Sequence, residues 1–296
     1  MIYDAIIVGG SYAGLAAGLP LARARRNILV IDAGQRRNRY AEHSHGFLTQ
    51  DGTPAADIAA RGRAQLMAYR TVDWLDAKVA NVVAADDGFR VDVEGMAPRE
   101  ARRIVLATGV SDQLPEVPGL AERWGRHVFH CPYCHGYELN EGRIGVLASS
   151  ALAMHVALML PDWGTTTLFL NGAFEPDAEQ LQALAARGVR VERSRVQRIE
   201  GRLDLVLQGG HVVKLDGLFA TPRISPASPI AATLGCDMDE GPMGRTVRTD
   251  AMKATSVAGV YACGDVARPG GSVSLAVGDG AIAGAAAHQS LIFARH

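Results

Sequence analysis

The feature of this sequence that most restricts the fold lies near its N-terminal end. A short apolar run, Ala5–Val8, is followed by the glycine-rich turn Gly9–Gly14 and by a small-residue stretch of helical character, Leu15–Ala24. A second apolar run, Asn27–Ile31, ends at an acidic residue, Asp32. Fully apolar runs of this length are typical of strands buried on both faces of a parallel sheet. The order of strand, turn, helix, strand and acid therefore predicts a βαβ unit that binds a dinucleotide.

The residues of this unit suit the two ends of an adenine dinucleotide. The turn offers backbone N–H groups and a helix N-terminus to the pyrophosphate. Asp32 is placed to bind the hydroxyls of the adenosine ribose. One position departs from the Gly-x-Gly-x-x-Gly pattern, because Ser11 stands where the middle glycine is expected. A serine can be accommodated there and its hydroxyl can bond a phosphate, so the motif is weakened but kept.

Length and charge narrow the class of protein further. The chain has 296 residues, enough for two modest domains with separate cores. Its formal net charge of −1 gives no reason to expect a nucleic acid or a membrane surface as a partner. The first ten residues lack the features of a signal peptide, and no apolar run approaches the roughly 18 residues of a spanning helix. We therefore expect a cytoplasmic protein.

A second alternation of strands and helices follows a proline-containing segment at Pro115 and Pro118. Ile144–Leu147 and Thr167–Leu170 are expected to be strands, with a helix at Leu152–Leu160 between them. The pattern of the first half is thus repeated. The sequence predicts an α/β fold with two Rossmann-like domains of three layers each.

A pair of cysteines two residues apart lies in the segment HCPYCHGYE, where His135 directly follows Cys134. Such spacing occurs in c-type haem attachment, zinc sites, structural disulfides and redox pairs. Haem attachment follows export, for which the sequence shows no signal. Zinc needs four ligands, and Cys236 and Cys263 show no second Cys-x-x-Cys spacing, so we expect both to be small buried residues. In a cytoplasmic protein such a pair is more often redox-active than a structural staple, so we predict that Cys131 and Cys134 are redox-active and that no metal is bound.

Four motifs, in this order, resemble those of the low-molecular-weight thioredoxin reductase family of flavoproteins. They are Gly9–Gly14, Ala107-Thr108-Gly109, Cys131–Cys134 and Ala262–Asp265, and the resemblance covers essentially the whole chain. It implies FAD as the cofactor and a homodimer as the assembly.

The resemblance also implies a division of the chain. Residues 1–114 and 242–296 would form one discontinuous FAD-binding domain. Residues 115–241 would form an inserted NADPH-like domain that carries the cysteine pair.

Residue by residue, the resemblance gives a set of expected FAD contacts. The Gly-Asp pair would hold the ribityl-phosphate region, and the last helix would point its N-terminus at the N1/C2 edge of the flavin, where a positive dipole stabilises the reduced anion. His45 would touch the isoalloxazine or the substrate. The expected contacts are Gly9, Gly10, Ser11, Tyr12, Ala13, Gly14, Asp32, Ala33, Arg39, His45, Gly46, Val79, Ala107, Thr108, Gly109, Gly264, Asp265, Ser272, Val273 and Ser274.

The second strand–helix turn departs from the family. Where the family carries Gly-x-Gly-x-x-Ala for NADPH, this chain has Ala148–Ala153, without either glycine. The arginines that hold the 2′-phosphate are replaced by Leu170-Asn171-Gly172 and Pro176. Each lost charge-assisted hydrogen bond is worth roughly 1.5–3 kcal/mol. We expect NADPH use to be lost, although binding through other residues, or NADH in place of NADPH, stays open.

Without NADPH, electrons can flow from a dithiol to the flavin. The segment Cys131–Glu138 resembles that of the dithiol oxidases of gliotoxin- and holomycin-type biosynthesis. This resemblance implies that a small-molecule dithiol is oxidised to a disulfide through Cys131, Cys134 and FAD, with oxygen as final acceptor and hydrogen peroxide released. By analogy Cys134 faces the flavin, Cys131 exchanges with the substrate, and His135, with a pKa near 6.5, takes the thiol proton. Glu138, one turn later, could orient that imidazole or could equally be a solvated residue of the helix.

Two alternatives remain open at this level. One is a thioredoxin-disulfide reductase-like enzyme that acts on a thioredoxin-like protein and is fed by NAD(P)H, ferredoxin or another donor. The other is a non-catalytic or redox-sensor flavoprotein that kept the fold after losing its donor. The intact cysteine pair favours an enzyme.

Overall fold

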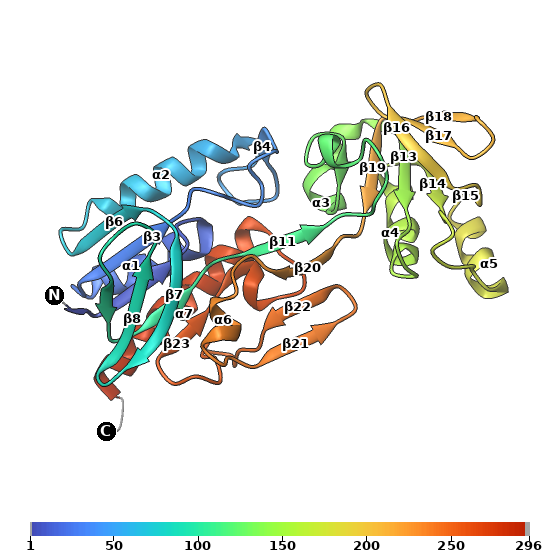
Figure 1. Ribbon diagram of the computed structural model, residues 1–296. Coiled ribbons are helices and arrows are strands. Elements are labelled where there is room, and N and C mark those ends of the chain that lie inside the picture. Colours follow the sequence, from blue (N-terminus) through green and yellow to red (C-terminus); the bar gives the residue numbers. More distant parts are fainter. Residues whose placement is uncertain (1, 294–296) are drawn as a thin grey trace. The chain divides into compact units, whose positions relative to one another are not determined.

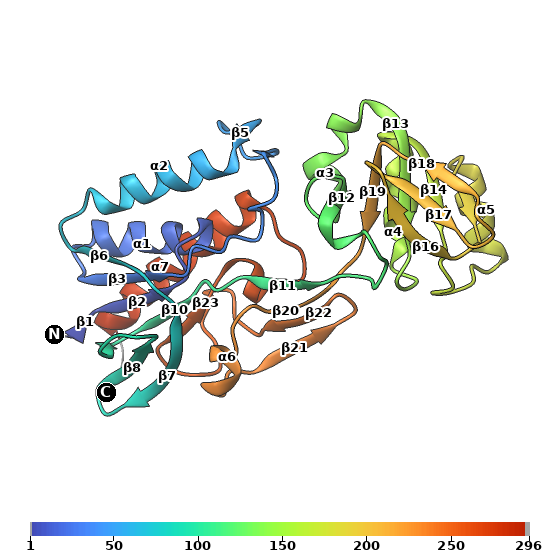
Figure 2. The same cartoon turned by 45° about the horizontal axis from the view of Figure 1, so that its top comes forward.

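The computed structural model describes residues 2–293 and divides into two compact units. The first unit holds the described residues up to Arg39, then Phe47–Ser111, and those from Ile224 onward. The second unit holds Tyr40–Gly46 and Asp112–Arg223. Each is described by itself below, with Figures 1 and 2 showing their elements.

The strands of the first unit are β1 (Ile2–Tyr3), β2 (Ala5–Val8), β3 (Ile28–Asp32), β5 (Thr53–Pro54), β6 (Val72–Asp76), β7 (Val79–Ala85), β8 (Gly88–Val93), β9 (Arg99–Ala101), β10 (Ile104–Leu106), β21 (Met238–Gly241), β22 (Gly244–Val247) and β23 (Val260–Ala262). Its helices are α1 (Tyr12–Arg23), α2 (Ala55–Met67), α6 (Ile230–Thr233), the 3₁₀ helix η4 (Gly264–Ala267) and α7 (Val273–Phe293). The chain leaves and re-enters this unit through β11 (Val110–Gln113) and β20 (Arg223–Pro226).

The first unit is built on a parallel sheet of five strands in the order β23-β10-β2-β3-β6. Alternate residues of β2 enter different cores, because successive strand side chains point to opposite faces. Ala5 and Ile7 pack with α1 and α7, whereas Ile6 and Val8 pack with β7 and β8. Figure 2 shows α1 and α2 together on one side of this sheet. The unit therefore has three layers, as the sequence predicts.

The chain returns to the first unit earlier than the expected boundary at residue 242. The return falls at Ile224, because β20, β22 and β21 continue the sheet that β11 begins. Ile230 and Ala231 of α6 are buried in the same core as Ile6. β11 and β20 are short neighbouring strands that lie far apart in the sequence, so no local pattern indicates that they belong to one sheet.

The strands of the second unit are β4 (His43–Ser44), β12 (Val128–Phe129), β13 (Glu141–Leu147), β14 (Gly164–Phe169), β15 (Arg190–Glu192), β16 (Val196–Glu200), β17 (Asp204–Leu207), β18 (Val212–Lys214) and β19 (Gly217–Ala220). Its helices are η1 (Ala121–Arg123), α3 (Pro132–His135), η2 (Tyr137–Leu139), α4 (Ala153–Met159), η3 (Leu160–Asp162) and α5 (Ala178–Ala186).

The second unit repeats the three-layer plan. Its parallel sheet has the order β12-β19-β13-β14-β15. Ile144 and Leu168 pack with α4 and α5 on one face, while Leu147 and Phe169 pack with the antiparallel strands β16 and β17 on the other. The predicted fold class, two Rossmann-like domains of three layers, is confirmed. Among residues 2–293, no helix is both long and apolar enough to cross a membrane.

Candidate functional site

At the first two positions of the turn between β2 and α1, no residue larger than glycine fits. Gly9 has φ of 104°, and a Cβ on it would overlap the carbonyl oxygen of Ala107. A Cβ on Gly10 would overlap the ring of Trp74 and lie 2.8 Å from the Cβ of Asp32. The N–H of Gly10 donates to Oδ1 of Asp32 over 3.0 Å. These contacts bring the second motif and the acid at the end of β3 against the turn.

The Gly-Asp pair near the C-terminus reaches the same place. Gly264 has φ of 74°, and a Cβ on it would lie 2.8 Å from the Cβ of Ala13. Asp265 forms an ion pair with Arg37, with 2.9 Å between Nη1 and Oδ2 and both side chains four-fifths buried. Motifs from both ends of the chain thus meet within the first unit.

Several polar groups around this turn are left without protein partners. Ser11 is the N-cap of α1, yet its side chain makes no capping hydrogen bond. Within the described residues, Nε of Arg36 and Oδ1 of Asn38 are buried and make no hydrogen bond. The amide of Asn38 donates to the hydroxyl of Tyr12 over 3.0 Å, and burial raises the pKa of Tyr12. Buried polar groups normally find partners, so these atoms indicate a place for a polar ligand.

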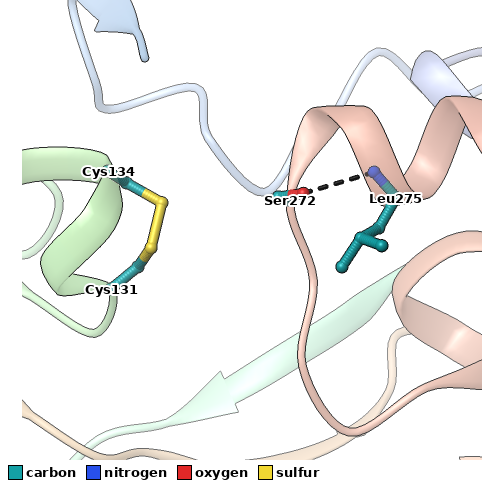
Figure 3. Close-up of a disulfide and its surroundings, with 4 residues drawn as sticks. All are labelled: Cys131, Cys134, Ser272 and Leu275. Atoms are coloured by element: carbon teal, nitrogen blue, oxygen red, sulfur yellow. Dashed lines mark hydrogen bonds between the residues drawn. A yellow bond between two sulfur atoms is a disulfide. The ribbon is translucent and has the colours of Figure 1, made fainter. Parts of the chain in front are cut away.

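The other residues expected to contact the cofactor in the first unit lie at the start of α7, after β3, after β10 or in the hydrophobic core. Ser272 accepts a hydrogen bond from the N–H of Leu275 over 3.2 Å at the start of α7, where Val273 and Ser274 also lie (Figure 3). Ala33 and Arg39 are exposed, and Arg39 donates to the carbonyl of Arg36 over 2.8 Å. The side chain of Val79 is 7% exposed and packs in the core. Thr108 and Gly109 directly follow Ala107.

The cysteine pair of the second unit forms a disulfide at the one-turn helix α3. Cys131 is the N-cap of this helix, Pro132 is its first residue, and Cys134 lies within it. The two Cα atoms are 5.3 Å apart (Figure 3). The pair is therefore in the oxidised form, ready to accept two electrons.

His135 lies against the disulfide helix in an apolar setting. Its ring stacks on Phe129, with 4.3 Å between the centroids and 22° between the planes. Burial, with a smaller contribution from the charge of His45, lowers the pKa of His135 to about 4. The ordinary imidazole value expected from the sequence is wrong here, because desolvation disfavours the charged ring. His135 is neutral at pH 7 and has a lone pair free to take a proton.

The carboxylate of Glu138 pairs with a different histidine from the one expected. Its Oε1 lies 3.4 Å from Nδ1 of His45, which belongs to the same unit although it is remote in sequence. Gly46, beside it, has φ of 72°. The second unit thus places two imidazoles and one carboxylate around its disulfide segment.

Aromatic side chains flank the disulfide. The ring of Tyr133 is 74% exposed and meets Trp163 edge-on, with centroids 5.4 Å apart. A Cβ on Gly136 would lie 2.7 Å from the Trp163 ring, so the turn after the disulfide packs closely on this indole. Tyr137 is 86% exposed. Exposed aromatic side chains therefore lie beside the disulfide.

The turn between β13 and α4 is filled by its own side chains. Ala148 is 1% exposed. The hydroxyl of Ser149 donates to the carbonyl of Thr221 over 3.0 Å, and that of Ser150 accepts from the N–H of Leu152 over 3.3 Å. The helix that follows has only seven residues. Groups that would face a pyrophosphate are engaged within the protein.

The loop after β14 is closed in a similar way. Oδ1 of Asn171 accepts from the N–H of Val196 over 3.0 Å. A Cβ on Gly172 would lie 2.7 Å from the guanidinium of Arg195, which therefore covers this glycine. The nearby Arg193 is paired with Glu175 at 2.8 Å. The side chains at this edge of the sheet bond one another.

The two remaining cysteines are buried, as expected. Cys236 is 5% exposed and Cys263 is 0% exposed. Burial raises the pKa of Cys263 to about 12, so this thiol is unreactive. The described part of the chain contains no group of three or more His, Cys, Asp or Glu side chains arranged to hold a metal ion.

Comparison with known proteins gives one family over nearly the whole chain. Residues 3–281 match the model of the pyridine nucleotide-disulphide oxidoreductases. The chain belongs to this family. It is 31% identical to thioredoxin reductase tcpT of Claviceps purpurea (strain 20.1), over 98% of this chain and 95% of that protein.

Two crystal structures are also similar to this chain. That of an oxidoreductase from Agrobacterium tumefaciens is 56% identical with a TM-score of 0.98, over the full length of both chains. That of HlmI is 36% identical with a TM-score of 0.90, over 98% of this chain and 93% of that one. The resemblance to thioredoxin reductases that the sequence motifs indicate is confirmed.

The protein is accordingly a thioredoxin reductase-like, FAD-dependent thiol–disulfide oxidoreductase. The residues of the first unit fit FAD. The glycines of its turn would let a pyrophosphate approach the backbone closely, and the buried polar atoms of Arg36 and Asn38 that lack hydrogen bonds could bind a polar ligand. The second unit does not fit the pyridine nucleotide of the family name in the same way, because Ser149, Ser150 and Asn171 are engaged internally.

Three residues that contact the turn or the Gly-Asp pair are absent from the set of expected FAD contacts. Arg37 pairs with Asp265, Trp74 packs on Gly10, and Asn38 bonds Tyr12. Arg37 and Asn38 lie in the stretch Arg36–Tyr40 after the second strand, where the resemblance places the chain near the flavin without giving either residue a contact. Trp74 carries no such signal, since only the paired strands β3 and β6 bring it beside the turn.

Proposed function

We propose that this protein oxidises a small-molecule dithiol to a disulfide, with oxygen as final electron acceptor. One substrate thiolate attacks a sulfur of the Cys131–Cys134 disulfide, which breaks that bond and forms a mixed disulfide. The second substrate thiolate then attacks the substrate sulfur of the mixed disulfide, so the product disulfide leaves and both cysteines are reduced. Bound FAD would supply the acceptor for the two electrons that the cysteines lose as their disulfide re-forms, and these electrons with the two thiol protons would reduce oxygen to hydrogen peroxide.

The observation that carries this proposal is the contrast between an intact disulfide and a closed nucleotide turn. Ala148 is buried, and the hydroxyls of Ser149 and Ser150 are engaged by Thr221 and Leu152. A nicotinamide donor has no open glycine turn to bind, whereas the disulfide remains able to accept electrons. The direction from dithiol to flavin needs no pyridine nucleotide.

Three side chains of the second unit would handle the thiol protons. Neutral His135, with its pKa of about 4, can accept a proton but holds it weakly. An imidazolium formed at His45 would face the Glu138 carboxylate at 3.4 Å. We assign proton uptake to His135 and onward transfer to His45 and Glu138. Following the resemblance, Cys131 exchanges with the substrate and Cys134 faces the flavin.

Anaerobic absorbance of the purified protein tests the proposal. We expect the preparation to be yellow, NADPH and NADH to leave the flavin oxidised, and dithiothreitol to bleach it. Admission of air should restore the yellow form and release about one peroxide per flavin bleached, since two electrons move in each turnover. Rapid bleaching by NADPH would overturn the proposed direction.

A cysteine variant separates an enzyme from a flavoprotein that has no thiol chemistry. Cys134→Ser should keep FAD bound and lose bleaching by dithiothreitol. Cys236→Ser serves as the matched control, because Cys236 is a buried free cysteine outside both the disulfide and the expected FAD contacts and should leave the bleaching rate unchanged. Equal rates in wild type and Cys134→Ser would mean that the pair is outside the electron path.

A second candidate is reduction of a thioredoxin-like protein. It is favoured by the name of the relative, thioredoxin reductase tcpT, and by exposed Tyr133 and Tyr137 beside the disulfide. This direction needs an external donor, such as NAD(P)H or a ferredoxin. Reduction of thioredoxin at the expense of either donor, with no oxidation of dithiothreitol in air, would favour it.

We also propose a homodimer. Ile282, Ile292 and Phe293 of α7 are 40%, 52% and 74% exposed, and a second copy could cover such apolar side chains. Light scattering at micromolar concentration should give about twice the mass of one chain if the proposal holds.

A further inference from the structure

A buried carboxylate lies in the middle of the last helix, away from the disulfide unit. Asp279 is 4% exposed and occupies a stretch of α7 that otherwise consists of small and apolar residues. Aspartate is almost never buried to this extent unless it is paired. Arg268 donates to both of its oxygens, with Nε to Oδ2 at 2.8 Å and Nη2 to Oδ1 at 3.1 Å. Lys253 lies 2.8 Å from Oδ1.

These two cations belong to segments on either side of the Gly-Asp pair. Lys253 precedes β23, and its carbonyl accepts a hydrogen bond from Ala262 at the end of that strand. Arg268 follows η4 and begins the connection to α7. Asp279 therefore ties the chain before the Gly-Asp pair and the chain after it to one point on α7.

The connection held in this way shapes the surroundings of Asp265. The Arg268 N–H donates to the carbonyl of Asp265 over 3.4 Å. Farther along the connection, a Cβ on Gly271 would overlap the Asp265 carboxylate, so the chain passes directly over it. Arg37 pairs with the same carboxylate at 2.9 Å. The connection ends at Ser272, which caps α7 through Leu275.

We propose that Asp279 is a positioning residue for FAD. By holding Arg268 it fixes the connection from Arg268 to Ser272, and this connection in turn fixes Asp265 and the first turn of α7. The inference rests on the assignment of FAD to the first unit. Asp279 does not touch the cofactor; it sets the geometry of the segment that does.

The experiment titrates FAD into the refolded apoprotein and measures affinity from the quenching of flavin fluorescence on binding. Thermal unfolding of the same samples is measured in parallel. Asp279→Asn keeps the shape of the side chain and removes its charge. We expect FAD to bind roughly ten- to a hundredfold more weakly, because two charge-assisted hydrogen bonds are degraded. Asp239→Asn is the matched control, since Asp239 pairs with Arg248 at 2.7 Å on the exposed hairpin of β21 and β22 and should leave FAD affinity unchanged.

A double-mutant comparison shows whether Asp279 acts through Arg268. Arg268→Gln should weaken FAD binding to a similar degree, and the double variant Asp279→Asn/Arg268→Gln should be no weaker than the worse single variant. If Asp279→Asn does not fold, Arg268→Gln tests the same contact from its more accessible side.

Two results would overturn the inference. One is an Asp279→Asn protein that binds FAD as the wild type does, even if its thermal midpoint falls, because this would make the residue purely structural. The other is a double variant whose loss is the sum of the two single losses. A wild-type protein that binds no FAD would instead overturn the assignment on which the inference rests.

Discussion

The two units share one architecture and differ in the turn where each would bind a nucleotide. In the first, Gly9 and Gly10 leave space against Ala107 and Trp74 that only a hydrogen atom fills. In the second, Ala148 is buried at the corresponding place and two serine hydroxyls are engaged within the protein. The layers are maintained by the cores, which do not depend on the turn. A Rossmann-like domain can therefore lose its ligand chemistry in a few residues and keep its fold.

The difference is also one of satisfied and unsatisfied polar groups. Around the first turn, Ser11 caps nothing and Asn38 and Arg36 each retain a buried atom without a partner. Around the second, Asn171 bonds Val196 and Arg193 bonds Glu175. Buried polar groups without hydrogen bonds lower the stability of the unliganded protein, and a bound ligand can supply the missing bonds. In a turn that binds no ligand, hydrogen bonds within the protein avoid this cost.

The strongest test of the comparison is Gly9→Ala. The added Cβ overlaps the Ala107 carbonyl, and the residue must also hold a φ of 104°. We expect loss of FAD and a fall of more than about 2 kcal/mol in the free energy of unfolding. Urea unfolding and the flavin absorbance of the purified protein measure the two effects.

The control for this variant is Gly188→Ala in the second unit. Gly188 has φ of 70°, and a Cβ there would meet nothing within 4 Å. It isolates backbone strain, which costs about 1 kcal/mol. Retention of FAD in both variants would contradict the assignment of the first turn to the cofactor.

The next largest effect is on pH dependence and concerns the second unit. The pKa of His135 is about 4 in the folded protein and 6.5 in the unfolded chain, so the unfolded chain binds more protons between these values. Stability is therefore nearly complete above about pH 6.5 and is lost as the pH falls toward 4, by on the order of 2 kcal/mol at pH 5. Urea unfolding at pH 7.5 and pH 5 should show the loss in wild type.

The variant His135→Gln should be less sensitive to the same change of pH. His155→Gln is a suitable comparison, because His155 is an exposed residue on α4 of the same unit. An equal loss of stability in wild type and His135→Gln would show that another group accounts for it.

A smaller effect is expected when glycines are restored to the second turn. Ala148→Gly/Ser150→Gly recovers the family pattern, but the arginines for a 2′-phosphate are still missing and Arg195 still covers Gly172. We expect NADPH to reduce the flavin less than about twofold faster than in wild type, since two glycines replace none of the lost charge-assisted bonds. Stopped-flow absorbance without oxygen measures the rate. A large gain would show that the two side chains alone had closed the site.

The smallest expected effect is that of Glu175→Gln. Its ion pair with Arg193 is exposed, with side chains 65% and 56% accessible. Exposed pairs contribute less than about 0.5 kcal/mol, so the unfolding midpoint should hardly change. A clear loss of stability would mean that this ion pair stabilises the edge of the second sheet more than exposed pairs usually do.

The elements that the sequence predicts well are those with strong local signals. Ala5–Val8 is β2 as expected, and the small-residue stretch after the glycine turn is α1. The last helix begins at Val273, directly after the Ser272 cap, which an apolar pattern does not mark. The motifs Gly9–Gly14 and Gly264–Asp265 do meet, although only the resemblance could place them together.

What the sequence could not give depends on contacts between remote residues. His45 pairs with Glu138, and Asp265 pairs with Arg37, and neither pair has a spacing that a local rule recognises. The pKa of His135 depends on burial, which a motif does not contain. The partners of Asp279, which are Arg268 and Lys253, likewise lie on other segments that no local pattern connects to α7.

The discontinuous first unit has a consequence for biosynthesis. Its parallel sheet includes β23, and the carbonyls of Ala13 and Ala17 on α1 lie against Gly280 and Gly284 of α7. The N-terminal part of this unit therefore cannot complete its packing until the C-terminal part has been synthesised. The second unit is nearly continuous in sequence and can fold during translation, since domains generally fold as units as they are synthesised. We expect the disulfide-bearing half to be complete first and flavin incorporation to follow only after α7 has emerged.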